Sequence, residues 1–204
     1  MMQRIFKVVS ALALCLAVAA CDSKPSNFYV LSAPGITTGA TAQTTRRRGL
    51  SIGVGPVTLP EYLDRPEIVI RENATALNVA DLNRWGGGLT ENFQSVLGEV
   101  LSERLNTDRV LLHPWSVSGN VTYQILVQVN AFEAQPDNQV LLDARWAVVS
   151  GGTQDVIRMG RTVLREPISG AEGGAGGPDY AQITAAMSRS VARLGQEIAA
   201  SGIR

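Results

Sequence analysis

Cysteine and histidine are almost absent from this sequence, and their scarcity limits the chemistry that the chain can perform. Among 204 residues there are two cysteines and one histidine, His113. Protein zinc sites take several cysteine or histidine ligands at characteristic spacings, and no such spacing is present. The G-x-S-x-G and H-E-x-x-H motifs of hydrolases are missing as well. The sequence therefore predicts a protein that is not an enzyme and that needs no cofactor or metal.

An excess of charge of either sign is also lacking. The chain has 18 basic and 18 acidic side chains and a formal net charge of zero. Nucleic-acid binding needs basic residues gathered on one face, so we predict no nucleic-acid partner. The single basic run, Arg46-Arg47-Arg48, lies in a Thr- and Gly-rich segment. It is either a solvated loop or a contact for anionic headgroups or an acidic partner, and the sequence leaves both open.

Long apolar runs are absent except near the N-terminus. Residues 8–20 are apolar or small throughout apart from Ser10, and they follow the charged residues Arg4 and Lys7. As a helix this segment would span roughly 20 Å, which is short of the roughly 30 Å hydrocarbon core of a bilayer. A charged segment followed by a short apolar one is typical of an export signal, so we predict that residues 1–20 are cleaved.

The end of this segment predicts a lipid anchor. Val18-Ala19-Ala20-Cys21 resembles the bacterial lipobox, in which the cysteine is acylated and becomes the new N-terminus; the alternative is an ordinary secretory signal. Two or more acyl chains hold a protein stably on a membrane. We therefore predict lipidation of Cys21, a tether over residues 21–27 and one domain over residues 28–204. A tether of this length reaches at most about 20 Å, so the domain is expected to lie close to the membrane.

Hydrophobic periodicity predicts two helices and several strands. Apolar residues recur every three or four positions over residues 89–105 and 180–198, the pattern of amphipathic helices. Alternation over residues 121–130, 140–148 and 155–165 predicts three long antiparallel strands. Shorter strands are expected at residues 28–31, 50–57, 67–70, 75–79 and 109–112. We therefore expect a single α+β domain in which a mixed, mostly antiparallel sheet is covered by two amphipathic helices.

A G-x-G pair, Gly53 and Gly55, follows an apolar run, as in some phosphate-binding loops. A dinucleotide fingerprint needs a third glycine and then a helix, but Pro56 and Pro60 keep the next residues out of a helix. We therefore predict no nucleotide site. The two glycines are expected instead to allow a strand bulge or a close approach to another backbone.

The proline-stiffened loop that comes next, residues 59–66, carries apolar side chains for which a loop offers no obvious use. Stiffening lowers the entropy cost of binding through such side chains. The alternative is that they fold back onto the edge of the sheet. The candidate partner-binding residues of this loop are Leu59, Tyr62, Leu63, Asp64 and Arg65.

Three segments resemble one known family. The stretches "FYVLSAP" (28–34), "IGVGPVTLPEYLDRPEIVIR" (52–71) and "LNRWGGGLTENFQSVLGEVLSERL" (82–105) are similar to the PqiC-like, ABC-type transport auxiliary lipoproteins. The run Gly86-Gly87-Gly88 departs from the acidic and proline residues that usually follow the R-W pair of the family. Trp85, the tryptophan of that pair, is a further candidate for partner binding.

The resemblance implies an accessory role in transport between two membranes. Its implied partners are an MCE-type transport protein with its permease and ATPase, the membrane through the acyl anchor, and further copies of the chain, for which a ring is one arrangement. It implies a periplasmic location, commonly on the outer membrane, whereas Asp22 after the lipidated cysteine resembles an inner-membrane retention signal. Two alternatives remain: a lipoprotein that binds a lipid or small ligand itself, and a structural envelope lipoprotein.

Overall fold

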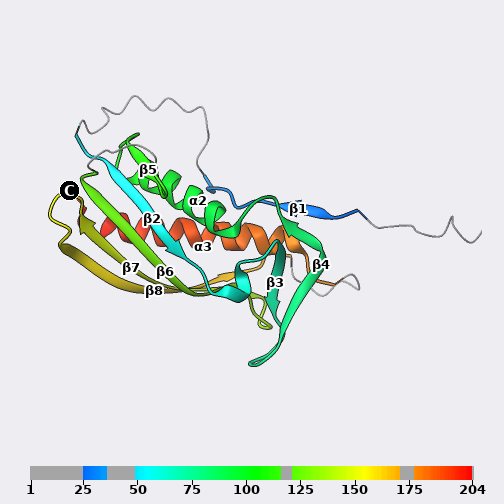
Figure 1. Cartoon of the computed structure of the whole chain (residues 1–204). Helices are drawn as coiled ribbons and strands as arrows, with labels where there is room; N and C mark the ends of the chain where they lie inside the picture. The colour runs from blue at the N-terminus through cyan, green and yellow to red at the C-terminus, as the bar shows by residue number, and fades with distance from the viewer. Residues whose placement is uncertain (1–24, 36–48, 116–120, 171–176, 204) are drawn as a thin grey trace, which may run out of the picture.

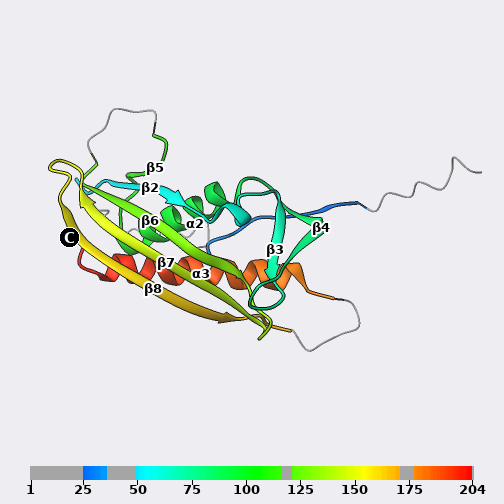
Figure 2. The same ribbon diagram turned by 60° about the horizontal axis from the view of Figure 1, so that its bottom comes forward.

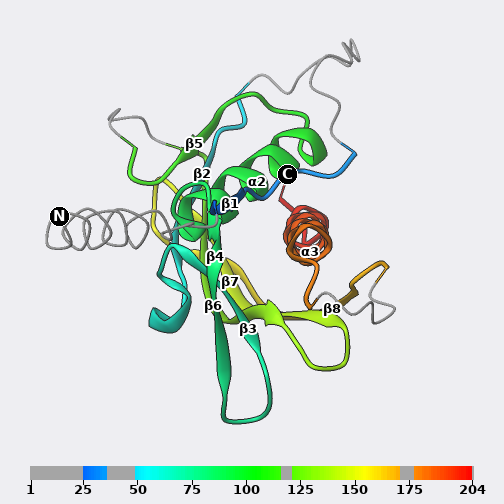
Figure 3. The same cartoon turned by 90° about the vertical axis from the view of Figure 1, so that its right-hand side faces the viewer.

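The fold is a mixed eight-stranded sheet with two helices packed on one of its faces (Figures 1 and 3). The computed structural model describes residues 25–35, 49–115, 121–170 and 177–203. The strands are β1 (Asn27–Tyr29), β2 (Ile52–Thr58), β3 (Glu67–Arg71), β4 (Leu77–Trp85), β5 (Val110–Leu112), β6 (Tyr123–Ala134), β7 (Gln139–Ser150) and β8 (Val156–Pro167). The helices are η2 (Glu61–Leu63), a single turn, and α2 (Leu89–Arg104) and α3 (Tyr180–Ala200). The predicted α+β class is confirmed.

The strand order places β6 at the centre of the sheet. One path runs β1-β4-β3-β6-β2-β5, and β7 and β8 continue from the other side of β6. The long antiparallel ladders β6–β7 and β7–β8 contain most of the residue pairs and lie side by side in Figure 2, while β2 pairs in parallel with both β5 and β6. Along one edge of β6, β2 pairs as far as Gln128 and β3 pairs only at Ala134. The chain between β2 and β3 therefore lies beside the unpaired part of this edge.

The core lies between the sheet and the two helices. Phe93 of α2 and Phe132 of β6 are fully buried and meet edge to face, with ring centroids 5.3 Å apart. The helices also approach each other closely, because a Cβ atom on Gly195 of α3 would lie 2.8 Å from the side chain of Val100 on α2. Burial of these apolar surfaces is the main favourable contribution to folding. In the described residues, no helix is both long enough and apolar enough to span a membrane.

Gly55 lies in a strand bulge, one of the two arrangements that the sequence predicted for the glycine pair, and Gly53 packs against the Trp115 ring. Gly55 has a φ angle of +113°, and a Cβ atom there would lie 2.6 Å from the Cβ atom of His113. The pairing of β2 with β6 shifts register between Val54 and Val57, which is a bulge. The side-chain amide of Gln94 in α2 donates to the carbonyl oxygens of Val54 (2.9 Å) in β2 and of His113 (2.7 Å), the residue after β5. These bonds join β2 and the end of β5 to α2. The pair is therefore a feature of strand packing.

The two helices begin differently. Gly88 precedes α2 and offers no side-chain cap, in agreement with the loose start that the glycine run suggests. Asp179 caps α3, since its carboxylate accepts hydrogen bonds from the backbone N–H groups of Ala181 (3.0 Å) and Gln182 (3.1 Å). The start of α3 is thus fixed by the side-chain cap of Asp179.

Candidate functional site

The loop over residues 59–66 is tightly turned and lies beside β6. Within it, Leu63 N donates to the carbonyl oxygen of Pro60 (2.9 Å) and Asp64 N donates to that of Glu61 (3.1 Å). These bonds close the single turn η2, and the prolines at both ends of the loop restrict its backbone further. The loop therefore has a defined conformation before any partner binds.

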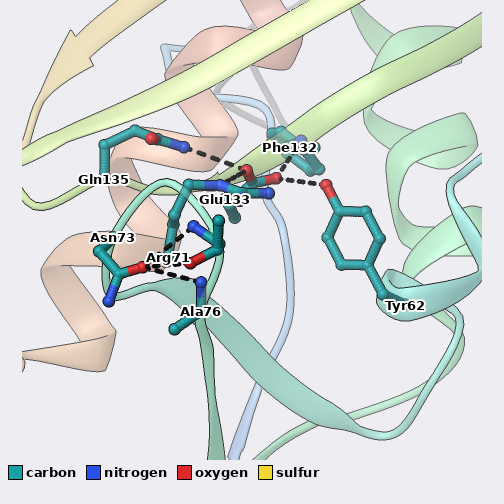
Figure 4. A network of polar contacts seen from close by, with 8 residues as sticks. Tyr62, Arg71, Asn73, Ala76, Phe132, Glu133 and Gln135 are labelled. Carbon is teal, nitrogen blue, oxygen red and sulfur yellow. Dashed lines mark hydrogen bonds and ion pairs between the residues drawn. The ribbon is translucent and has the colours of Figure 1, made fainter.

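A buried carboxylate, Glu133 of β6, attaches this loop to the sheet (Figure 4). One of its oxygens accepts from the Tyr62 hydroxyl (3.0 Å) and from the backbone N–H of Phe132 (2.8 Å). The other accepts from Arg71 Nε (2.9 Å) and from the side-chain amide of Gln135 (3.0 Å). A buried charge is costly unless it is paired and hydrogen-bonded, and here four donors meet that need. The network thus connects the loop, β3 and β6.

The protonation states in this network suit a structural clamp. Burial and, next, the Glu133 carboxylate raise the pKa of the Tyr62 phenol from 10.0 to about 12, although Arg71 opposes part of this rise. The hydrogen bond that Arg71 donates to Glu133 raises the pKa of Arg71 above its ordinary value. At neutral pH the phenol therefore keeps its proton and the guanidinium keeps its charge, so both groups act as permanent donors.

The predicted loop residues divide into a packed set and an exposed set. Leu63 is buried, and Leu59 and Tyr62 are half-buried against the core. This is the folded-back arrangement that the sequence left open as an alternative. Asp64 and Arg65 are exposed, so they are the predicted loop residues that a partner can reach. Their role in partner binding stays a prediction.

Trp85 lies at the base of the same loop. Its backbone N–H donates to the carbonyl oxygen of Pro66 (2.7 Å), and its side chain is buried. Beside it, Glu67 accepts from Arg65 Nε at 3.1 Å and pairs with Arg84 Nη2 at 3.3 Å. The hydrogen bond from Arg65 lowers the pKa of Glu67, so this carboxylate stays ionised between the two guanidinium groups. The structure therefore brings the loop and the R-W pair together.

The N-terminal strand reaches this end of the domain as well. In the parallel pairing of β1 with β4, Phe28 lies opposite Arg84 and Tyr29 lies opposite Trp85. Phe28 is 67% exposed and Val30 is 58% exposed. The strand expected over residues 28–31 is observed at Asn27–Tyr29, so Val30 lies just beyond it, and the exposure of Phe28 and Val30 was not predicted. Cys21, the predicted lipidation site, lies outside the described residues.

The lone histidine has a packing role. The ring of His113 meets the ring of Trp115 edge to face, with centroids 5.6 Å apart. Along the stretches that the structure describes, no group of three or more His, Cys, Asp or Glu side chains is arranged to hold a metal ion. The buried polar side chains of Glu133 and Gln94 hold loops and strands in place through their hydrogen bonds. The fold and these contacts define an α+β domain that presents a rigid loop and its N-terminal strand at one end.

Comparison with known proteins assigns this domain to a family. The family model of the ABC-type transport auxiliary lipoprotein component matches residues 29–199. Because the match covers most of the chain, the chain belongs to this family. Its association with ABC-type transport as an auxiliary lipoprotein follows from that membership. No curated protein has a significantly matching sequence.

Solved structures share the fold at low sequence identity. One is an uncharacterised protein with a TM-score of 0.65 and 16% identity, covering 87% of this chain and 98% of its own. Another is XCC0632 from Xanthomonas campestris, a DUF330 family protein, with a TM-score of 0.62 and 14% identity, covering 84% of this chain and 92% of its own. At these identities the likeness concerns the fold.

Proposed function

We propose that this chain is a non-enzymatic, lipid-anchored periplasmic accessory subunit of an ABC/MCE-type intermembrane lipid transport system. The observation that carries the proposal is the family match over residues 29–199. A lipoprotein signal ending at Cys21 is consistent with it, since acylation there would hold the domain on a membrane. The outer membrane is the favoured location, and Asp22 is the reason to test the inner membrane too.

The loop over residues 59–66 is the surface that we propose for docking to the MCE-type partner. Its backbone is held by Glu133 through Tyr62, so little conformational entropy is lost on binding. Glu61, Asp64 and Arg65 are exposed and present both signs of charge on this rigid support. Charged residues on an exposed surface contribute mainly to partner choice and to the rate of association. The packed residues Leu59 and Leu63 support the loop from beneath.

The test is co-purification of the acylated protein with the MCE-type protein of the same cell. A double charge reversal, Asp64→Lys with Arg65→Glu, is expected to remove the partner from the eluate. It leaves Tyr62 and Leu63 in place, so the loss of the exposed Arg65–Glu67 pair costs about 1 kcal/mol or less. Circular dichroism and thermal unfolding check that the variant is folded.

The matched control is Asp155→Lys with Arg158→Glu. It makes the same charge changes on exposed residues at the N-terminal end of β8. This variant is expected to retain the partner. Partner retained by the folded loop variant would show that the loop is not the docking surface. An unaltered, acylated protein that captures no MCE-type protein would contradict the proposed function itself.

A further inference from the structure

Strand β1 and the two residues that follow it, Val30 and Leu31, place their side chains on a packed side and an exposed side. On the packed face, the side chain of Asn27 donates to that of Asn83 (3.1 Å), Tyr29 lies near Tyr180, and Leu31 is buried. Successive side chains of a strand point to opposite sides, so Phe28 points away from Asn27 and Tyr29. Val30 directly follows the strand and lies beside Gly86. Phe28 and Val30 are 67% and 58% exposed. Two apolar side chains, one in β1 and one directly after it, thus face solvent.

The neighbouring residues leave this pair uncovered. Among the described strands β1 pairs only with β4, which makes it an edge strand. The residue beside Val30 is Gly86, where a Cβ atom would lie 3.0 Å from Val30 Cγ1. The glycines at 87 and 88 that follow are exposed and have no side chains either. The glycine run that interrupts the family pattern therefore keeps the apolar pair open to its surroundings.

Positive charge borders the pair. Arg84 lies opposite Phe28 in the register of β1 and β4. It shares the carboxylate of Glu67 with Arg65, so two guanidinium groups meet one carboxylate, and each arginine side chain is 42% exposed. The cluster carries a net charge of one positive unit. An apolar pair beside exposed guanidinium groups is the combination that favours an anionic lipid surface.

The position of the predicted lipid anchor indicates what the exposed pair, Phe28 and Val30, contacts. Cys21 lies six positions before Asn27, and a chain of that length spans at most about 20 Å whatever its conformation. If Cys21 is acylated, β1 is the first described strand after the anchor, and it lies within this distance of the lipid. We propose that Phe28 and Val30 insert into the interfacial layer of the membrane that holds the anchor, with Arg84 facing its anionic headgroups. This inference rests on the proposed function, because it requires the acylated N-terminus.

The anchor also makes such weak insertion effective. Two side chains alone would bind a bilayer weakly, but the acyl chains already hold the domain at the surface, so insertion becomes an intramolecular event. Transfer of apolar side chains out of water is favourable, and guanidinium groups pair readily with phosphate. The result would be a domain with one orientation on the membrane, which a flexible tether alone does not provide.

A single-thiol label tests the inference on the full acylated chain. The sequence has only Cys15, in the predicted signal, and Cys21, so the acylated protein has no free thiol and Val30→Cys introduces one. An environment-sensitive NBD label at position 30 is read in vesicles of phosphatidylethanolamine and phosphatidylglycerol. Met159→Cys is the matched control, since Met159 is also apolar and is 73% exposed on β8.

Insertion predicts that NBD emission at position 30 rises about twofold or more and shifts to the blue on vesicle binding. Spin-labelled acyl chains should quench the emission at position 30. The label at position 159 should keep the emission of NBD in water both with and without vesicles. Adding Phe28→Ser to the Val30→Cys chain should reduce the change at position 30. Replacing phosphatidylglycerol by phosphatidylcholine should reduce it as well.

The outcomes separate this inference from the proposed function. If the unaltered protein takes up the label or does not float with vesicles, Cys21 is not acylated, and both proposals fail. If the protein floats but the label at position 30 reports water, insertion is excluded while the anchor stands. A label that is equally shielded without vesicles would show that another protein or a second copy covers the pair, and this too would overturn the inference.

Discussion

Glu133 is the residue on which the arrangement of the loop depends most. Its side chain is fully buried, and it accepts hydrogen bonds from Tyr62 and Arg71, which lie 71 and 62 positions earlier in the chain. Removing one partner of a buried ion pair leaves the other charge without compensation. The network therefore makes the position of the loop sensitive to a single carboxylate in the middle of the fold.

Glu133→Ala is expected to lower the free energy of unfolding by about 3 kcal/mol, because it leaves Arg71 and the Tyr62 hydroxyl without an acceptor. Urea denaturation measures the change. The control is Asp137→Ala, which removes a carboxylate from an exposed pair with Arg165 and should cost about 0.5 kcal/mol or less. Equal effects of the two substitutions would contradict the structural role of Glu133.

The raised pKa of Tyr62 predicts a loss of stability in alkali. The folded protein keeps the phenol proton up to about pH 12, whereas the unfolded chain loses it near pH 10. The contribution of this site is therefore complete below pH 10 and declines as the pH rises toward 12. In Tyr62→Phe this part of the decline should disappear. Unfolding free energies measured at intervals over that range test the difference, and parallel curves for the two proteins would disprove it.

At the scale of single elements, tertiary pairing corrects what local pattern predicts. Residues 75–79 were expected to form a strand, but β4 continues to Trp85. The added residues include Asp81, Asn83 and Arg84, which lack apolar alternation. They are held in the strand by β1 on one side and by Glu67 of β3 on the other. Strand length here follows from neighbours that are distant in the sequence.

Helix α3 offers an element-scale prediction. Asp179→Ala should lower the free energy of unfolding by about 1 kcal/mol, because the N–H groups of Ala181 and Gln182 lose their acceptor. Asp179→Asn keeps an oxygen in place and should cost much less. Chemical denaturation of the three proteins measures both effects. A large loss in the asparagine variant would indicate that the charge, rather than the cap, is important.

At the scale of the whole molecule, the anchor and the fold are expected to be independent. Cys21→Ser removes the proposed acylation site, which precedes β1 by several positions, so the protein should leave the membrane fraction after export. Its melting temperature should stay within about 1 °C of that of the delipidated original, since no core residue changes. Fractionation and thermal unfolding check the two statements separately. Continued membrane binding would point to a second attachment.

Much of the architecture could be predicted because its signals are local. The two helices and the three long strands were expected, and a bulge was one of two arrangements expected for the glycine pair; the structure confirms the elements and places the bulge at Gly55. Periodicity and glycine placement depend on neighbours a few positions away, and a sequence displays these directly. The parallel pairing of β2 with β6 and β5 was not specified, because register between distant strands has no local signal.

The candidate site was predictable only in outline. The sequence pointed to the loop over residues 59–66 and to Trp85, and the structure brings them together. It did not single out Glu133 or Arg71. A lone carboxylate between Phe132 and Ala134 is a weak sign of a buried acid, and its partners could not be named from it. The hydrogen bond between Tyr62 and Glu133 holds the loop against the sheet, and this position decides which of its side chains are buried.

The sequence by itself determined the amphipathic helices, the strand pattern and the resemblance to a lipoprotein family, and it is the basis for predicting an export signal and a lipobox-like site. All of these are read from short windows, in which neighbouring residues share one helix face or one strand face. Only the tertiary structure decided that Phe28 and Val30 stay exposed while Leu63 is buried, and that Glu133 holds the loop. Burial and ion pairing depend on segments that come together only when the chain folds, so no short window contains them.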